Sequence, residues 1–228
     1  PLLLAVVVPP YLLLMSSNQL LTWHLSMLLL VALLLFLVLK NSAWDHWLML
    51  AVGSVVCLLI GQHNAVDYSE QLFVFRQNYG AGLFFIALFA GYGFLFGRKY
   101  PKRLGFALLA SLSGFVIISC LYVITPDHAL MTAYPVWCFV LLALSAWLFK
   151  LSINSTNPMQ VFSYWLGGNA NISLALTMLL EGSSLTLALA AQVLLISFYV
   201  NKQSLSIPTW PLKGLVGALL VRLSFAPW

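Results

Sequence analysis

The chain has very little charge. Only 7% of its 228 residues are charged, whereas 62% are hydrophobic, and the mean hydropathy is +1.00. Soluble domains carry about 25% charged residues. So few charged side chains cannot cover the surface of a water-soluble protein. The composition therefore excludes that class and predicts a protein whose main partner is the lipid bilayer.

Cysteine is scarce, and the usual catalytic motifs are missing. The three cysteines, Cys57, Cys120 and Cys138, lie inside separate apolar runs. An odd number of dispersed cysteines argues against a disulfide framework and against a cysteine-rich metal site. The sequence contains no nucleophile elbow, phosphate loop, HExxH or CxxC. It therefore predicts no cofactor and no metal.

Long apolar runs are abundant. A helix that crosses about 30 Å of hydrocarbon needs roughly 20 apolar residues, and the runs predict an all-α, polytopic transmembrane helix bundle of about 8–9 spans. The expected spans are 1–14, 20–39, 45–61, 80–97, 104–124 and 130–149 in an N-terminal bundle (1–150), and 161–180, 184–201 and 210–227 in a C-terminal three-helix unit (151–228). The chain opens "PLLLAVVVPPYLLL" and stops as a hydrophobic run ends, which predicts a segment of a larger membrane protein.

The orientation follows from the basic residues. The stretch "GRKYPKR", residues 97–103, holds four of them, and loops rich in Lys and Arg stay in the cytoplasm. Alternation from that loop places the loops 62–79 and 125–129 in the periplasm or outside the cell. The net charge of +5 reflects this flanking pattern and does not indicate nucleic-acid binding. We therefore expect a multi-pass protein of the bacterial inner membrane.

Glu181 lies between two apolar runs in "LTMLLEGSSLTLALAAQ". Lys150 and Lys202 should both be cytoplasmic, so an even number of crossings must separate them. Two helices with an outer turn at 181–183 satisfy this condition. They also avoid the ~2.5–3.5 kcal/mol that a charge at a helix centre costs.

Polar residues interrupt the expected helix 161–180 halfway along, next to Gly167-Gly168. Three consecutive helices bring a set of polar side chains to one membrane level: Asn169, Asn171, Gln192 and Arg222. An intramembrane arginine suggests a functional site, and a broken helix beside it is typical of transporters. The alternative is that these side chains only hydrogen-bond to one another and to backbone carbonyls, locking three helices together.

A second group of polar residues falls on the expected outer face. It consists of His63, Asp67, Glu70, Asp127, His128 and Glu181. Imidazole and carboxylate groups can bind zinc or iron, or accept protons. The spacing from His63 to Glu70 matches no motif of fixed geometry, so the favoured interpretation is solvated loop residues.

The C-terminal third carries a resemblance. The stretches "LLEGSSLTLALAAQVLLISFY" and "LKGLVGALLVRLSFAPW" resemble the large polytopic bacterial inner-membrane proteins of the domain-of-unknown-function 2339 family. Glu181, Gly182 and Arg222 match the pattern of that family, whereas Gln192 and Ala226 depart from it. The segment "FVFRQNYGAGLFFIALFAGYGFLFGRKYPKRLGFALLASLSG" resembles its helix–basic loop–helix unit. The resemblance implies a polytopic architecture and an inner-membrane location, and it brings no activity.

Three functions fit the sequence. The first is a helical scaffold or assembly partner in the bacterial envelope, which would contact other membrane subunits or further parts of a longer chain. The second is a transporter or channel for a small anionic or lipid-linked solute that uses Arg222. The third is a membrane transferase that acts on a lipid-linked substrate with the outer-face acids. The absence of catalytic motifs favours a protein that is not an enzyme.

Overall fold

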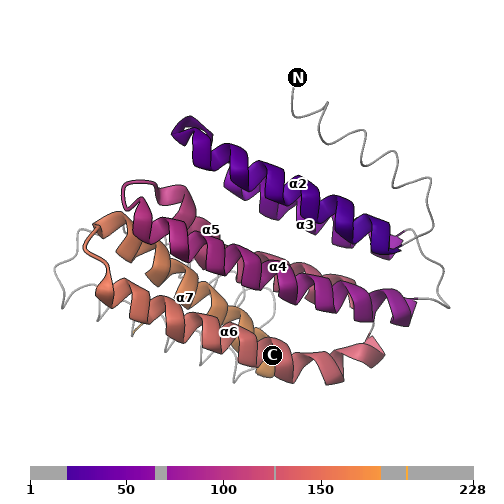
Figure 1. The fold of residues 1–228 in the computed structure, drawn as a ribbon. Helices are drawn as coiled ribbons and strands as arrows, with labels where there is room; N and C mark the ends of the chain where they lie inside the picture. The colour runs from indigo at the N-terminus through magenta and orange to yellow at the C-terminus, as the bar shows by residue number, and fades with distance from the viewer. Residues whose placement is uncertain (1–19, 65–70, 126, 181–193, 195–228) are drawn as a thin grey trace, which may run out of the picture. The chain divides into compact units, whose positions relative to one another are not determined.

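A computed structural model describes residues 20–64, 71–125, 127–180 and Leu194 (Figure 1). These residues form α-helices and one short 3-10 helix, and no strand occurs among them. The predicted all-α class is therefore confirmed. The chain divides into two compact units, Pro1–Leu130 and Met131–Trp228.

The first unit contains two helical hairpins. Its elements are α2 (Leu20–Lys40), η1 (Ser42–Trp44), α3 (Trp47–Asn64), α4 (Gln71–Lys99) and α5 (Leu104–Ile124). The short η1 segment joins α2 to α3, and a tight turn joins α4 to α5. Helix α4 packs most extensively on α5, and α3 packs on both α5 and α2 (Figure 1).

A glycine lets α4 approach α5 closely. A Cβ atom added at Gly93 would lie 2.6 Å from the Phe106 carbonyl oxygen and 2.7 Å from the Ala110 nitrogen. Small residues at helix interfaces allow backbones to approach in this way, so that van der Waals packing can hold helices together in lipid. The absence of a side chain at Gly93 therefore permits the close approach of α4 and α5 at this point.

The second unit contains most of α6, from Met131 onward, and α7. Helix α6 spans Asp127–Asn154 and contains Pro135, and α7 spans Pro158–Leu179. Asn157 caps α7, because its side-chain oxygen accepts a hydrogen bond from the Met159 nitrogen at 3.0 Å. Pro158 follows at the first helical position, where a missing N–H costs nothing. These two signals determine where α7 begins.

Three of the described helices are long and apolar enough to cross a membrane. They are Asn78–Lys99, Leu104–Ile124 and Ala133–Asn154. Two shorter apolar helices, His24–Lys40 and Trp47–His63, accompany them. Helix α7 does not reach the same hydropathy, because polar residues such as Gln160, Asn169 and Asn171 lie among its apolar ones.

The prediction of about 8–9 spans is not supported by these three helices. The expected spans at 20–39 and 45–61 fall on helices whose apolar part is shorter, and 161–180 falls on the more polar α7. The spans expected at 1–14, 184–201 and 210–227 lie outside the described residues, Leu194 excepted.

The prediction of a loop at 62–79 is wrong for most of that stretch. Helix α3 continues to Asn64 and α4 begins at Gln71, so most of that stretch is helical. Polar side chains lower hydropathy without ending a helix, and residues 71–79 contain no proline to break it. The basic stretch 97–103 is likewise partly helical, because α4 ends only at Lys99, two residues before Pro101.

Candidate functional site

Helix α7 is continuous through Gly167 and Gly168. The helix break on which the transport alternative relies is therefore not found in α7. A Cβ atom at Gly168 would lie 3.1–3.4 Å from the Phe149 ring of α6, and the Gly168 carbonyl accepts a hydrogen bond from Ser145 Oγ at 2.9 Å. Glycine at this position serves close packing between α6 and α7 rather than a break.

The two asparagines of the predicted midplane cluster are buried in α7. Asn169 Nδ2 donates to the Trp165 carbonyl at 2.8 Å, and Asn171 Nδ2 donates to the Gly167 carbonyl at 2.7 Å. Both bonds run back to the residue four positions earlier in the same helix. The amide nitrogens of both asparagines are thus bonded to their own helix. Gln192 and Arg222 lie outside the described residues, so the four-residue cluster stays a prediction.

The outer-face residues are only partly covered by the structure. His63 lies in the last turn of α3 and is half-buried, and Asp127 and His128 open α6. Asp67, Glu70 and Glu181 lie outside the described residues. Within the described ranges, no group of three or more His, Cys, Asp or Glu residues could hold a metal ion.

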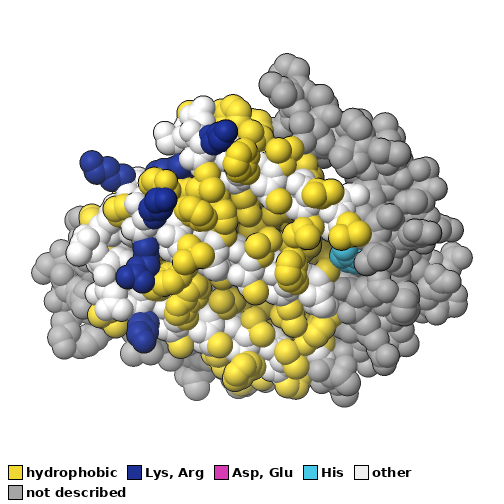
Figure 2. Space-filling model, viewed as in Figure 1, with side chains coloured by type: hydrophobic (Ala, Val, Ile, Leu, Met, Phe, Trp, Pro, Cys, Tyr) yellow, Lys and Arg dark blue, Asp and Glu magenta, His cyan; other side chains and the backbone are white. Residues whose placement is uncertain are grey.

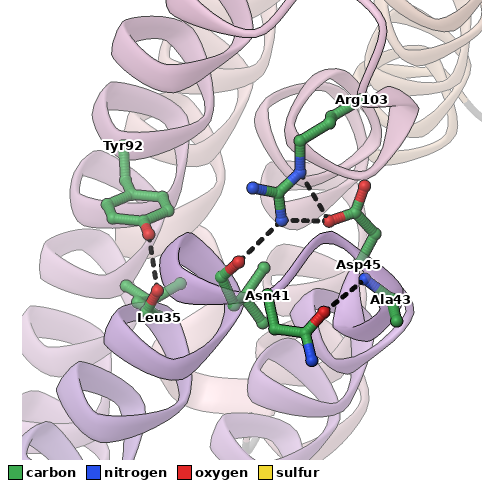
Figure 3. A network of polar contacts seen from close by, with 7 residues as sticks. Leu35, Asn41, Ala43, Asp45, Tyr92 and Arg103 are labelled. Carbon is green, nitrogen blue, oxygen red and sulfur yellow. Dashed lines mark hydrogen bonds and ion pairs between the residues drawn. The ribbon is translucent and has the colours of Figure 1, made fainter.

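The most developed polar network is at the opposite end of the first unit. Arg103, which precedes α5, donates from Nε to Asp45 Oδ1 at 2.8 Å, and its Nη2 forms an ion pair with the same carboxylate. The same Nη2 donates to the Val38 carbonyl near the end of α2 at 2.7 Å (Figure 3). The Arg103 side chain is 13% exposed and that of Asp45 26%. One guanidinium therefore ties α2, the η1 turn and the α4–α5 turn together.

Aromatic rings surround this ion pair. The Arg103 guanidinium carbon lies 4.6 Å from the centre of the Phe106 ring and 5.7 Å from that of Tyr100. Tyr92 of α4 donates its hydroxyl to the Leu35 carbonyl of α2 at 2.7 Å (Figure 3). Rings near a cation add favourable electrostatic attraction and keep water away from the pair. The network therefore fastens the α2–α3 hairpin to the α4–α5 hairpin.

The sequence contains a signal for this pair. Asp45 is the one acidic residue that the predicted orientation places on the cytoplasmic side, close in the membrane frame to the four cations of 97–103. A lone carboxylate among cations is expected to form an ion pair. The cation that pairs with Asp45 depends on how the two hairpins align. That alignment cannot be predicted from the local sequence.

Further cations and two tryptophans surround the network. We define the basic end as Lys40, Arg98, Lys99, Lys102, Trp44 and Trp47. Its four Lys and Arg side chains are exposed, and dark-blue side chains of this kind gather along one edge of the hydrophobic surface (Figure 2). The rings of Trp44 and Trp47 stack with their centres 5.0 Å apart. Exposed cations at this density can bind phosphate and other anions.

Comparison with known proteins adds no relative. No protein-family model matches the chain, and neither the curated proteins nor the solved structures contain a match. The functional proposal therefore depends on the helices and on the polar contacts described above.

Proposed function

We propose that this protein is a helical scaffold or assembly partner in the bacterial inner membrane. The observation that carries the proposal is that several polar side chains inside the apolar helices form hydrogen bonds to helix backbones. Ser145, Asn169, Asn171 and Tyr92 all donate to backbone carbonyls of helices. Since an unsatisfied polar group in lipid costs several kcal/mol, these four donors stabilise the helices and are not left free to bind a solute.

The membrane location is supported by the three long apolar helices. The inner membrane and the cytoplasmic position of the basic end are proposals that rest on the positive-inside rule. The resemblance to the domain-of-unknown-function 2339 family, also a proposal, is consistent with that location. Partners would be other membrane subunits or further parts of a longer chain.

The transport alternative loses one of its two supports, because α7 continues through Gly167 and Gly168. Its other support, Arg222, lies outside the described residues. The transferase alternative requires outer-face acids close together, and three of the four, Asp67, Glu70 and Glu181, lie outside the described residues as well. No contact in the described helices favours either alternative over a scaffold.

Water access to α7 tests the scaffold proposal. The full chain without its three native cysteines would carry Asn171→Cys, with Lys150→Cys as the exposed control in the same unit. One sample of the membranes would be extracted with alkaline carbonate to verify insertion. Closed vesicles of both orientations, not treated with carbonate, would be exposed to a small membrane-impermeant thiol reagent. We expect labelling at position 150 from one side and none at 171. Labelling at 171 would show a hydrated path to the middle of α7 and would make transport the better explanation.

A further inference from the structure

We infer that the basic end binds the headgroups of anionic phospholipids. The inference rests on the proposed membrane location and is independent of the scaffold role. It starts from the charge balance at this end of the first unit. Arg103 and Asp45 neutralise each other, and no ion pair among the described residues engages the other four cations. Four positive charges are therefore left for an external anion.

The cations are held at the edge of the apolar surface. Lys40 Nζ lies 5.0 Å from the centre of the Phe36 ring, and the guanidinium carbon of Arg98 lies 5.5 Å from that of Phe94. In each case the ring precedes the cation by one helical turn. The stems and the charged heads therefore lie against apolar rings near the helix ends, a position that basic side chains adopt at the boundary of hydrocarbon and water.

The tryptophan stack indicates the same boundary. Tryptophan is enriched at the headgroup level, because its ring is apolar and its N–H is polar. Trp44 and Trp47 stack between the end of α2 and the start of α3, next to Lys40 in the chain. The cations of the basic end are thus placed where lipid phosphates would lie.

Exposed apolar residues next to the cations decide between a lipid and a soluble anion. Phe36 is 53% exposed and Leu95 63% exposed, and each lies one helical turn before a lysine, Lys40 and Lys99. A soluble phosphate or a nucleic acid would use the cations and leave this apolar surface uncovered. A phospholipid with an anionic headgroup accounts for the cations and for the apolar surface, because its phosphate binds the cations while its acyl chains cover the apolar side chains.

Lipid selection by the lysines provides the test. Each Lys or Arg near an anionic surface strengthens attraction by about five-fold at moderate salt. The full chain would be purified in a non-ionic detergent with equal amounts of phosphatidylglycerol and phosphatidylcholine, and native mass spectrometry would count the retained lipids. The test variant is K40Q/K99Q/K102Q, and the matched control is K40R/K99R/K102R, which preserves charge.

We expect the wild type and the arginine control to prefer phosphatidylglycerol, and the glutamine variant to lose that preference by about ten-fold or more. An equal count of both lipids on the wild type would overturn the inference, as would an unchanged preference in the glutamine variant. Displacement of the lipid by excess glycerol phosphate would assign the site to soluble phosphates instead.

Two further measurements distinguish a failure of the lipid inference from misfolding of the variant and from a failure of the proposed membrane location. If the glutamine variant fails to fold, the lipid preference of the wild type is measured as ammonium acetate, the volatile salt that this mass spectrometry requires, is raised from about 0.05 to about 0.5 M, where screening should reduce it. A preference that does not change with salt contradicts the inference. Carbonate extraction of every variant reports membrane insertion, so a loss of lipid preference with insertion intact leaves the proposed membrane location standing.

Discussion

Arg103 and Asp45 lie 58 positions apart in the chain, and the guanidinium of one meets the carboxylate of the other at the junction of two helical hairpins. The same guanidinium reaches the Val38 carbonyl. Its planar fork can serve a carboxylate and a carbonyl at once, which a lysine ammonium at the same place cannot do with equal geometry. The pair is thus a specific tertiary contact and more than a surface ion pair.

Replacement of Arg103 by lysine should destabilise the first unit. We expect R103K to lower the free energy of unfolding by about 1–3 kcal/mol, because one of the charge-assisted hydrogen bonds at this partly buried site is lost. Unfolding by sodium dodecyl sulfate in mixed micelles, followed by tryptophan fluorescence, measures the change.

A double-mutant cycle with Asp45→Asn then isolates the pair. The coupling between R103K and D45N should be about 0.5–3 kcal/mol, as found for residues in one ion-pair network. Strict additivity of the two single variants would mean that the contact contributes nothing to stability.

Helices whose ends coincide with a change in hydropathy could be predicted well from the sequence. The span expected at 104–124 coincides with α5, and the one expected at 20–39 differs from α2 by a single residue. Helix α4 was predicted too short, because Asn78 and the polar residues before it stay helical without adding hydropathy. Hydropathy thus reports the apolar part of a helix and not its full length.

The contacts between helices could not be predicted in the same way. The role of Gly168 depends on Phe149, and the partner of Asp45 depends on how two hairpins align. A glycine pair beside asparagines is compatible with a helix break or with close packing, and only the neighbouring helix distinguishes them. The role of such a glycine and the partner of such a carboxylate are determined by tertiary packing, which leaves no local pattern in the sequence.

Two glycines in the C-terminal half of α4, Gly91 and Gly93, should differ sharply when substituted. A Cβ atom at Gly93 would meet backbone atoms of α5 at 2.6 and 2.7 Å, whereas nothing lies within 4 Å of a Cβ at Gly91. We expect G93A to cost about 1–3 kcal/mol through overpacking. G91A should be neutral or stabilise by up to about 1 kcal/mol, because alanine is the better helix former.

The same unfolding assay compares these two variants under identical conditions. Because both changes are Gly→Ala on one helix, intrinsic helix propensity cancels between them. Equal stability of G93A and G91A would show that α4 does not approach α5 closely at Gly93.

Ser145 should contribute through its hydrogen bond to α7. Ser145 Oγ is buried and donates to the Gly168 carbonyl at 2.9 Å. We expect S145A to destabilise by about 0.6 kcal/mol, and by no more than about 1.7 kcal/mol, the range of interhelical hydrogen bonds in membranes. Ser54 is the control, because its hydroxyl donates within its own helix to the Ala51 carbonyl at 2.9 Å. S54A should change stability by less than S145A; the reverse order would contradict an interhelical role for Ser145.

Gln62 is a buried side chain whose replacement should stabilise the protein. It is 3% exposed near the end of α3, and neither its amide nitrogen nor its amide oxygen has a hydrogen-bond partner among the described residues. A buried polar group without a partner costs about 1–3 kcal/mol, and leucine fills a similar volume without that cost. Q62L should therefore raise the free energy of unfolding.

Gln160 provides the matched control, since it is 5% exposed in α7 and its amide atoms are not left unpartnered. Q160L removes a satisfied group and should lower stability, so the same substitution at the two positions should have opposite signs. If Q62L also destabilises, the Gln62 amide has a partner in the membrane that the described helices do not supply. That result would identify the C-terminal end of α3 as a site where another chain or a lipid binds.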